Sequence, residues 1–326
     1  MRLQECVAFL VGSLRSCAKQ NDLEEGIQLH AYILRRRLLQ ENTIVLGNSL
    51  MDMYAKCGEL SRARQVFSEL PERNVVSWTV LITSYTQRGF AKEALKCFQC
   101  MKKEGILPNA MTYASILRAI GSIREAEKGE EIHCAIISQG IFLGRDIILG
   151  NALVCMYVKC GLMEMAQWVF YELPARNRES WNALIAGYTR HGQCYQAFNC
   201  FEQMKKDGIP PNKITFYTVL SACCHSGMVS EGQDYFLSMR RDYGLYPIIE
   251  HYNILVDILV RAGRLHDAED LIYTMPFRPS VTSWRTLLSG CRMYRNVELG
   301  KHAAKYACDL DPQSDSTYAI LSGLLI

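Results

Sequence analysis

The sequence predicts an all-α fold, a right-handed α-solenoid superhelix of helix–turn–helix repeats. Two observations lead to this prediction. Motifs recur along the 326-residue chain at a constant interval, and within each copy the apolar residues follow the spacing of amphipathic helices. A chain of this kind stacks similar units on one another, so we expect a continuous core along the array and no single catalytic pocket.

The repeat interval is 103 residues. Trp78, Trp181 and Trp284 are separated by this distance both times. The same shift relates several shorter motifs, which are His30 and His133, Gly47-Asn48 and Gly150-Asn151, Lys56-Cys57-Gly58 and Lys159-Cys160-Gly161, Pro71 and Pro174, and Gly105 and Gly208. Because no net insertion separates the copies, we interpret the chain as a repeat array.

Each copy divides into three pairs of short helices. In residues 178–212, for example, Trp181, Leu184 and Tyr188 lie on the apolar stripe of a first helix, and Gly208 ends the second helix. The predicted repeats span residues 7–43, 44–74, 75–109, 110–146, 147–177, 178–212, 213–248 and 249–280, and residues 281–326 form a further segment. We expect the chain to begin inside a repeat, without a leader peptide, and to be truncated at its C-terminus.

Composition limits the class of protein. With 49% hydrophobic and 21% charged residues, the chain can bury a continuous core and is not a disordered polymer. Its net charge of +3 is compatible with a polyanionic partner without requiring one. The 14 cysteines recur inside apolar helical stretches, as Cys97 and Cys200 do, which favours free thiols in a reducing compartment. No run of 18 apolar residues occurs, so we expect no membrane span.

Several ordered motifs resemble those of the plant pentatricopeptide repeat family. They are Val75-Val76-Ser77-Trp78, Asn151-Ala152-Leu153-Val154-Cys155-Met156-Tyr157, Glu250-His251-Tyr252-Asn253, Trp284-Arg285-Thr286-Leu287-Leu288 and Leu310-Asp311-Pro312. The resemblance is to the subgroup with alternating P, L and S repeats and a following E motif. In its terms the array is L 7–43, S 44–74, P 75–109, L 110–146, S 147–177, P 178–212, L 213–248 and S 249–280, with an E-like motif over 281–326. Tetratricopeptide repeats share the hairpin but keep a near-constant spacing of about 34 residues.

The resemblance implies a function. Members of the family bind single-stranded organellar RNA at roughly one base per repeat, and this subgroup mostly specifies sites of cytidine-to-uridine editing. We therefore expect an RNA-binding site-recognition factor in a mitochondrion, or else in a chloroplast. Its partners would be organellar RNA and, through residues 281–326, a deaminase or editing-complex protein. We expect a monomer without a cofactor or a metal ion.

By the same resemblance, two polar residues of each repeat read one base. These pairs are Asn48 with Asn74, Thr79 with Asn109, Asn151 with Asn177, Asn182 with Asn212, and Asn253 with Ser280. Thr–Asn favours adenine, Asn–Asn favours pyrimidines, and Asn–Ser leans toward cytidine. The L-type repeats carry Val11 with Thr43, Ala114 with Asp146 and Tyr217 with Ile248, and we assign them no base.

Apolar residues at the second position of each repeat are expected to sandwich the bases. They are Val45, Val76, Met111, Ile148 and Ile214. Glu179 occupies this position in its repeat and does not fit, because a carboxylate beside a base and its phosphates weakens that slot.

Each of these residue types also has a purely structural interpretation. Asparagine at a helix start often serves only as a cap. The three tryptophans fit core packing better than base stacking, and His30 and His133 are expected to pack between helices. Lys102-Lys103 and Lys205-Lys206 suit the solvated ends of second helices. The Cys-x-x-Cys formed by Cys97 and Cys100 has no second pair, which argues against a metal site.

The chain lacks the motifs of a cytidine deaminase. Neither His-x-Glu nor Pro-Cys-x-x-Cys occurs in it, and both are needed to hold zinc and move protons in that reaction. We therefore expect an adaptor for a deaminase and not an enzyme. One alternative is a helical scaffold whose groove binds a protein or peptide. Another is that the gene encodes an editing enzyme whose catalytic domain follows Ile326.

Overall fold

The computed structural model describes residues 3–39, 44–141, 146–313 and 315–325, and every regular element among them is an α-helix. The predicted all-α repeat fold is therefore confirmed. The chain forms two compact units, residues 1–175 and 176–326, which are described separately. Unit 1 contains α1 (Leu3–Gln20), α2 (Leu23–Arg35), α3 (Ile44–Lys56), α4 (Leu60–Glu69), α5 (Val75–Gln87), α6 (Ala91–Lys103), α7 (Ala110–Ile123), α8 (Ala126–Ser138), α9 (Ile147–Cys160) and α10 (Met163–Glu172).

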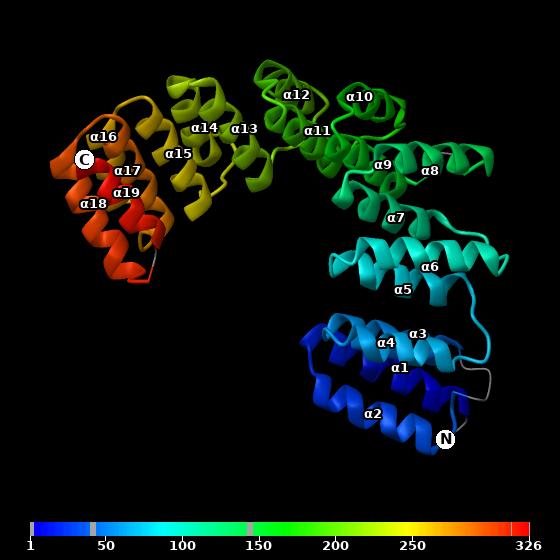
Figure 1. The fold of residues 1–326 in the computed structure, drawn as a ribbon. Helices are drawn as coiled ribbons and strands as arrows, with labels where there is room; N and C mark the ends of the chain where they lie inside the picture. Colours follow the sequence, from blue (N-terminus) through cyan, green and yellow to red (C-terminus); the bar gives the residue numbers. More distant parts are fainter. Residues whose placement is uncertain (1–2, 40–43, 142–145, 314, 326) are drawn as a thin grey trace. The chain divides into compact units, whose positions relative to one another are not determined.

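Unit 2 continues the same pattern of helical hairpins (Figure 1). Its helices are α11 (Arg178–Arg190), α12 (Cys194–Lys206), α13 (Lys213–Ser226), α14 (Val229–Arg241), α15 (Ile249–Arg261), α16 (Leu265–Thr274), α17 (Val281–Met293), α18 (Val297–Leu310) and α19 (Asp315–Leu325). From α3 to α17 each odd-numbered helix begins at the first residue of a segment predicted above. The assignment of these segments to P, L and S types stays a prediction.

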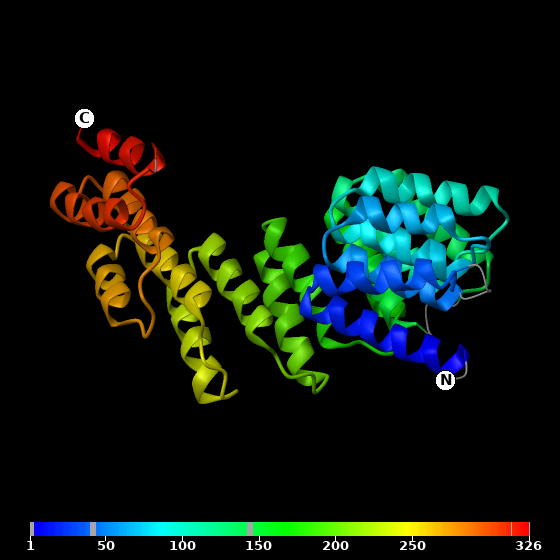
Figure 2. The same cartoon turned by 90° about the horizontal axis from the view of Figure 1, so that it is seen from below.

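The hairpins of each unit form two layers. The odd-numbered first helices pack against one another in order, α1 on α3 and onward to α9 in unit 1, and α11 on α13 and onward to α19 in unit 2 (Figures 1 and 2). Among the described residues, no two successive second helices bring their Cα atoms within 8 Å. The first helices therefore form the tighter, inner layer of each unit, and the second helices form the wider outer layer.

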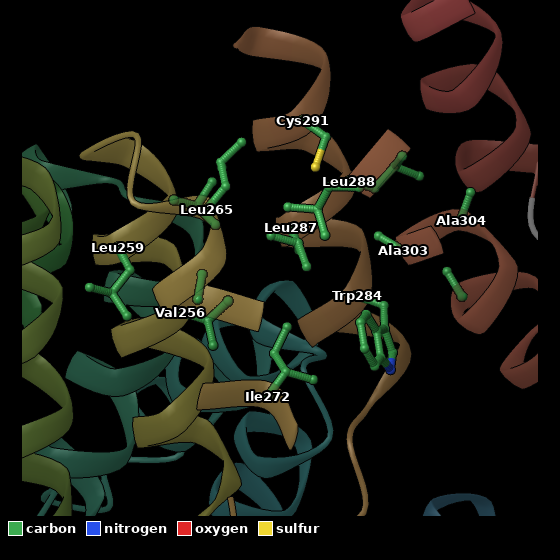
Figure 3. Packing of buried hydrophobic residues seen from close by; sticks show 14 of the residues in the cluster. Val256, Leu259, Leu265, Ile272, Trp284, Leu287, Leu288, Cys291, Ala303 and Ala304 are labelled. Carbon is green, nitrogen blue, oxygen red and sulfur yellow. The ribbon is translucent and has the colours of Figure 1, made fainter. Parts of the chain in front are cut away.

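The recurring residues have packing roles. Trp78, Trp181 and Trp284 are all buried, which confirms core packing. Gly150 allows close approach of Leu173, because a Cβ placed on Gly150 would lie 2.4 Å from the Leu173 Cδ2 atom. In unit 2 the core continues from α15 to α19 without a break, and Trp284 of α17 lies between the aliphatic side chains of α15 and α16 and the alanines Ala303 and Ala304 (Figure 3).

The recurring histidines pack against tyrosines of the next hairpin. The Nδ1 atom of His30 lies 2.8 Å from the Tyr54 hydroxyl, and that of His133 lies 2.7 Å from the Tyr157 hydroxyl. Burial lowers the pKa of both imidazoles, so they are neutral packing groups at neutral pH. The interpretation of these histidines as interhelical contacts is confirmed.

Gly208 ends α12 as the sequence predicts. Its φ of 72° lies in the left-handed region, where a Cβ is unfavourable, and Gly105 repeats this conformation at the end of α6 with φ 73°. Lys205 and Lys206 lie in the last turn of α12 and are exposed, as expected for a solvated helix end.

Candidate nucleic-acid interface

The first residue of each predicted RNA-reading pair lies on one face of a first helix. Counting from each helix start at α3 or later, positions 2, 5, 9 and 13 follow one another at steps of three, four and four residues and therefore lie on one side of a helix. In α9 this face carries Ile148, Asn151, Cys155 and Lys159. The core side chains of a first helix, such as Trp181 at position 4 of α11, point the opposite way.

The apolar residues at position 2 are exposed. The side chains predicted to sandwich bases have exposed fractions between 43% and 62%, and they are Val45, Val76, Met111, Ile148 and Ile214. Each belongs to a different first helix of its unit. Exposed aliphatic residues that recur at one helical position form a row of contact sites, because the core does not use them. Glu179, at the same position in α11, is exposed as well.

The second residue of each predicted pair is a helix N-cap. Asn109 accepts a hydrogen bond from the Thr112 backbone N–H at 2.9 Å, and Asn212 accepts one from the Thr215 N–H at 2.9 Å. All five members of this set cap the next first helix in this way, and they are Asn74, Asn109, Asn177, Asn212 and Ser280. The structural role considered from the sequence is therefore real. The capping hydrogen bond uses the side-chain oxygen of each asparagine. Within the described part of the chain, nothing accepts a hydrogen bond from the Nδ2 group of Asn109 or Asn212.

Three predicted pairs are joined through a hydroxyl at the third helical position. The Thr112 Oγ1 atom lies 2.7 Å from Thr79 Oγ1 and 2.9 Å from Asn109 Oδ1, so it links α5 to α7. In unit 2 the Thr215 hydroxyl donates to Asn182 Oδ1 at 2.7 Å and lies 3.0 Å from Asn212 Oδ1.

The third joined pair lies in the last repeat. The Ser283 hydroxyl donates to Asn253 Oδ1 at 2.6 Å, and the Ser283 and Ser280 Oγ atoms are 2.9 Å apart. The structure thus brings Thr79 and Asn109, Asn182 and Asn212, and Asn253 and Ser280 to shared corners between adjacent first helices. The sequence contains a signal for the linking hydroxyls, a capping residue followed three positions later by serine or threonine.

Two predicted pairs are not joined in this way. Asn48 is 8% exposed, its Oδ1 atom has no hydrogen-bond partner, and no hydrogen bond with Asn74 is observed in the described residues. Asn74 accepts from the backbone N–H groups of Val76 and Ser77. The fifth pair, Asn151 and Asn177, has one member in each unit, so the structure defines each residue only in its own unit.

The L-type repeats present different chemistry at these positions. Ala114 is completely buried, and Asp146 caps α9 through hydrogen bonds from the backbone N–H groups of Ile148 and Leu149. Tyr217 is exposed. Thr43 lies outside the described residues.

Basic side chains extend the same face toward the helix ends. Lys56, Lys159 and Arg190 are exposed at position 13, and Arg118 is exposed at position 9 of α7. Lys56 pairs with Asp52 at 2.7 Å. In two first helices, α3 and α9, the face therefore carries an apolar residue, an asparagine and a lysine in that order. Such an order suits the base and phosphate of one nucleotide.

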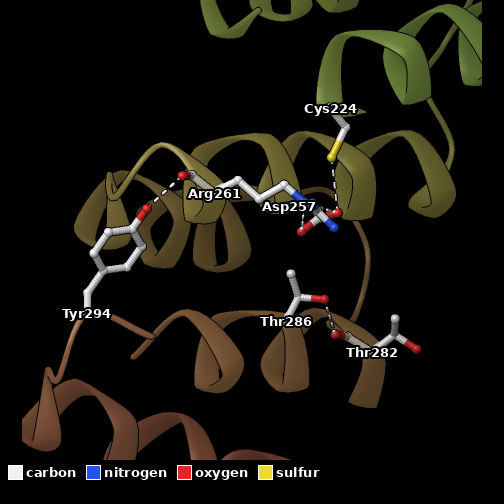
Figure 4. A network of polar contacts seen from close by, with 6 residues as sticks. All are labelled: Cys224, Asp257, Arg261, Thr282, Thr286 and Tyr294. Carbon is white, nitrogen blue, oxygen red and sulfur yellow. Dashed lines mark hydrogen bonds and ion pairs between the residues drawn. The ribbon is translucent and has the colours of Figure 1, made fainter. Parts of the chain in front are cut away.

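Asn253 and Tyr217 line a cavity of about 540 Å³ on this face of unit 2. Asp257 lines this cavity. Its carboxylate accepts a hydrogen bond from the Nε–H of Arg261 at 3.0 Å and another from the thiol of Cys224 at 3.0 Å (Figure 4). Burial, reinforced by the hydrogen bond to Asp257, raises the pKa of Cys224 to about 12, so this thiol stays protonated. The cavity thus combines an exposed aromatic ring with a polar amide.

The structure shows no arrangement for metal chemistry in the residues it describes. Within those ranges, no three His, Cys, Asp or Glu side chains come together as metal ligands. Burial raises the pKa of Cys97 to about 11, which disfavours the thiolate that metal binding and redox exchange require. Likewise, no described helix combines the length and apolar character needed to cross a bilayer.

The stacked hairpins with a repeating polar corner on the inner layer define an α-helical repeat protein. Comparison with family descriptions is specific: the PPR repeat family matches residues 73–121 and 176–225, and the PPR repeat matches residues 48–75, 151–177, 214–243 and 250–278. The chain belongs to the pentatricopeptide repeat family.

Several relatives from Arabidopsis thaliana are named as pentatricopeptide repeat-containing proteins. One pentatricopeptide repeat-containing protein is 40% identical over 315 residues, which cover 97% of this chain and 43% of the relative. A mitochondrial one is 35% identical over 311 residues, covering 95% of this chain and 66% of the relative. A chloroplastic one is 38% identical over 315 residues, covering 97% and 42%. The chain thus spans less than two thirds of the length of each of these relatives.

Solved structures share the fold. The pentatricopeptide repeat protein PPR10 in complex with an 18-nt psaJ RNA element matches with a TM-score of 0.74 at 17% sequence identity, over 91% of this chain and 44% of that chain. PPR10 from maize, solved separately, matches with a TM-score of 0.52 at 20% identity, over 97% and 52%. At this level of identity the likeness establishes the fold alone.

Proposed function

We propose that this protein binds single-stranded organellar RNA in a sequence-specific manner and directs a deaminase to cytidines for editing. The observation that carries RNA binding is the row of exposed aliphatic residues beside polar corners on the inner layer. Stacked bases need an apolar surface on each side and a polar group at the edge, and these first helices supply both. The structural neighbour PPR10, in complex with an RNA element, supports the same ligand class.

The corners are suited to reading base edges. At Asn109 and Asn212 the cap fixes the amide oxygen on the helix, so the Nδ2 group is held as a donor toward the ligand. A donor held in this way loses little conformational freedom when it binds a base. One well-placed pair discriminates between bases by about 1–3 kcal/mol. From the family resemblance, we assign the order pyrimidine, adenine, unspecified, pyrimidine, pyrimidine, unspecified, cytidine from 5′ to 3′.

Editing enters as the finer part of the proposal. The chain lacks the His-x-Glu and Pro-Cys-x-x-Cys motifs, so the deaminase is supplied by another polypeptide or another domain. Residues 281–326 are the proposed protein contact, with the exposed Met293 and Tyr318 among their apolar side chains. The mitochondrial and chloroplastic names of relatives support the proposal that the protein acts in a mitochondrion or a chloroplast.

A fluorescence-anisotropy titration tests RNA binding. One labelled RNA carries the order given above, with U at the pyrimidine positions, and a second exchanges its adenine and pyrimidines. We expect the first RNA to bind about tenfold tighter or more, which corresponds to about 1.4 kcal/mol. Equal affinity for both, or no binding below micromolar concentrations at moderate salt, would favour the alternative function, a scaffold for a protein or peptide.

Crosslinking in the plant organelle tests the editing role separately. RNA bound to the protein is crosslinked and sequenced, and editing at nearby cytidines is compared between wild-type and knockout plants. We expect a crosslinked site to lie next to a cytidine that is read as uridine only when the protein is present. Crosslinked sites with unchanged editing in the knockout would leave RNA binding in place and refute the editing role.

A further inference from the structure

The outer side of unit 1 contains a cavity of about 550 Å³ between α4 and α6. Its floor is formed by Trp78, Leu81 and Tyr85 of α5, and Cys97 and Cys100 of α6 line one wall. The floor residues occupy positions 4, 7 and 11 of α5, two residues from positions 2, 5 and 9. Two residues correspond to about 200° around a helix, so this outer cavity opens on the side opposite the proposed RNA face.

The floor of the outer cavity has an unused hydrogen-bond donor. Trp78 is 4% exposed, and its Nε1 group has no acceptor among the residues that the structure describes. A buried indole N–H usually finds a partner, and one left without an acceptor costs about 1–3 kcal/mol. Phe67 contacts the indole edge-on, with 4.6 Å between ring centroids, and supplies no acceptor.

Unit 2 contains a counterpart of this site that is filled from within the chain. Trp284, which lies 206 residues after Trp78, stacks on Tyr306 with 4.6 Å between ring centroids and 11° between ring planes. Tyr273 contacts the same indole edge-on at 5.5 Å, and His302 lies 5.0 Å from the Tyr306 ring. The chain itself therefore covers Trp284 with aromatic side chains.

In unit 1 the positions that correspond to Tyr306 and His302 carry no rings. Cys100 stands 206 residues before Tyr306, and Lys96 stands 206 residues before His302. A thiol and a lysine in place of two rings leave the space over Trp78 open, which explains the position of the outer cavity. The counterpart shows that this geometry accepts an aromatic ring stacked on the indole.

Charge also differs between the two sites. In unit 2 Glu269, the fifth residue of α16, accepts a hydrogen bond from His302 at 2.9 Å. The fifth residue of α4 is Arg64, which lines the outer cavity together with Lys96. Within the described ranges, neither Arg64 nor Lys96 has a carboxylate within 4.0 Å, although Glu93 also lines the cavity. The lining therefore carries three cations, Arg64, Arg73 and Lys96, and one carboxylate, Glu93. Arg73 pairs with Glu104 at 3.5 Å, which leaves Arg64 and Lys96 as the cations without a carboxylate partner among the described residues.

We propose that the outer cavity is a docking site for a protein segment that carries an aromatic side chain flanked by carboxylates. The ring takes the place that Tyr306 occupies over Trp284, and the carboxylates pair with Arg64 and Lys96. An amino-acid ring is favoured over a nucleobase because the filled counterpart uses amino-acid rings and the cavity faces away from the RNA side. The proposed partner would bind the outer layer of unit 1, whereas RNA would bind the inner layer. This proposal does not depend on RNA binding.

Filling the outer cavity tests the proposal. Cys100→Tyr introduces the ring of the counterpart at an exposed position, and Gln99→Tyr places the same ring on the neighbouring exposed position outside the cavity lining. The probe is a fluorescein-labelled acidic pentapeptide with a central tyrosine, compared with the same peptide with a central alanine. Binding to the full chain is measured by anisotropy.

We expect the tyrosine peptide to bind wild-type protein about tenfold tighter or more than the alanine peptide, as for a buried aromatic anchor. Cys100→Tyr removes this difference, Gln99→Tyr retains it, and Lys96→Glu weakens binding of the acidic peptide without filling the cavity. Equal binding of the two peptides to wild-type protein, or unchanged binding to Cys100→Tyr, overturns the proposal.

RNA affinity provides the remaining control. The titration with the labelled RNA is repeated on Cys100→Tyr, and circular dichroism verifies its folding. We expect unchanged RNA affinity. A loss of RNA affinity as large as the loss of peptide affinity would assign the cavity to RNA and overturn the proposal. If Cys100→Tyr does not fold, Lys96→Glu decides, because it changes an exposed charge only: peptide affinity as in wild-type protein then refutes the site.

Discussion

Residues 75–109 and 178–212 form equivalent repeats, one in each unit, and they differ where RNA would be read. Both first helices, α5 and α11, are 13 residues long. In each case an asparagine caps the N-terminus of the following first helix. The linking distance is the same as well, 2.7 Å from Thr112 to Thr79 and 2.7 Å from Thr215 to Asn182. The backbone and the cap therefore fix the corner, and one side chain decides its chemistry.

The two corners offer different numbers of donors. The Thr79 hydroxyl has a single proton and two close neighbours, Thr112 Oγ1 and the Val75 carbonyl at 2.6 Å. Asn182 uses its Oδ1 atom for Thr215, and its Nδ2 group makes only a long contact of 3.4 Å with Asn212. If these corners read bases as proposed, a base would meet the Thr79 hydroxyl in unit 1 and the Asn182 amide donor in unit 2.

The largest expected effect concerns the cores below the two corners. Trp181→Ala and Trp78→Ala each delete a buried indole, and such deletions cost about 3–5 kcal/mol of unfolding free energy. We expect Trp181→Ala to cost more, because Trp181 is completely buried whereas Trp78 borders the outer cavity. Urea unfolding of both variants measures the difference. An equal or larger loss for Trp78→Ala would show that the outer cavity does not weaken its packing.

Much of this comparison was predictable from the sequence. The 103-residue interval, the apolar stripe through Trp181 and the left-handed glycine Gly208 all follow from local spacing, because a helix turn and its termination depend on residues a few positions apart. The exposure of the side chains at position 2 of the first helices follows from the same periodicity. These predictions needed no information about how one hairpin packs on the next.

Other features required the packing of hairpins. The link between Thr79 and Thr112 joins residues 33 positions apart and depends on the register of α5 against α7. The burial of Asn48 depends in the same way on its neighbours, since its position in the repeat matches that of the half-buried Asn182. A single sequence shows which groups are polar, but long-range register decides whether a ligand can reach them.

An exchange of the two corner side chains tests whether they read bases. Thr79→Asn should move the preference of one nucleotide from adenine toward pyrimidine, and Asn182→Thr should move another nucleotide in the opposite direction. Each change is expected to alter discrimination by about 1–3 kcal/mol. Titration of RNAs that differ at single positions measures this effect. A uniform loss of affinity for all RNAs would instead mean that these side chains support the fold only.

The caps give the next effect in size. Asn109→Ala and Asn212→Ala remove a cap and should each cost about 1 kcal/mol of stability. We expect the larger loss for Asn212→Ala, because Asn182 also donates to Asn212. The Asp variants at the same positions keep a capping oxygen and replace the Nδ2 donor, so they separate the two roles by urea unfolding and RNA titration. If Asn109→Asp restored both stability and base preference, the amide would have no reading role.

The smallest expected effect lies at position 2, where Val76 and Glu179 differ. Removing the carboxylate by Glu179→Val should tighten RNA binding by about 0.5–1 kcal/mol, because an exposed charge near phosphates acts through screened solvent. Val76→Glu, its mirror in unit 1, should weaken binding by a similar amount. Both titrations are repeated at high salt, where the two differences should shrink. If Glu179→Val bound no better at low salt, position 2 of α11 would lie away from the RNA, and the two repeats would differ in path as well as in chemistry.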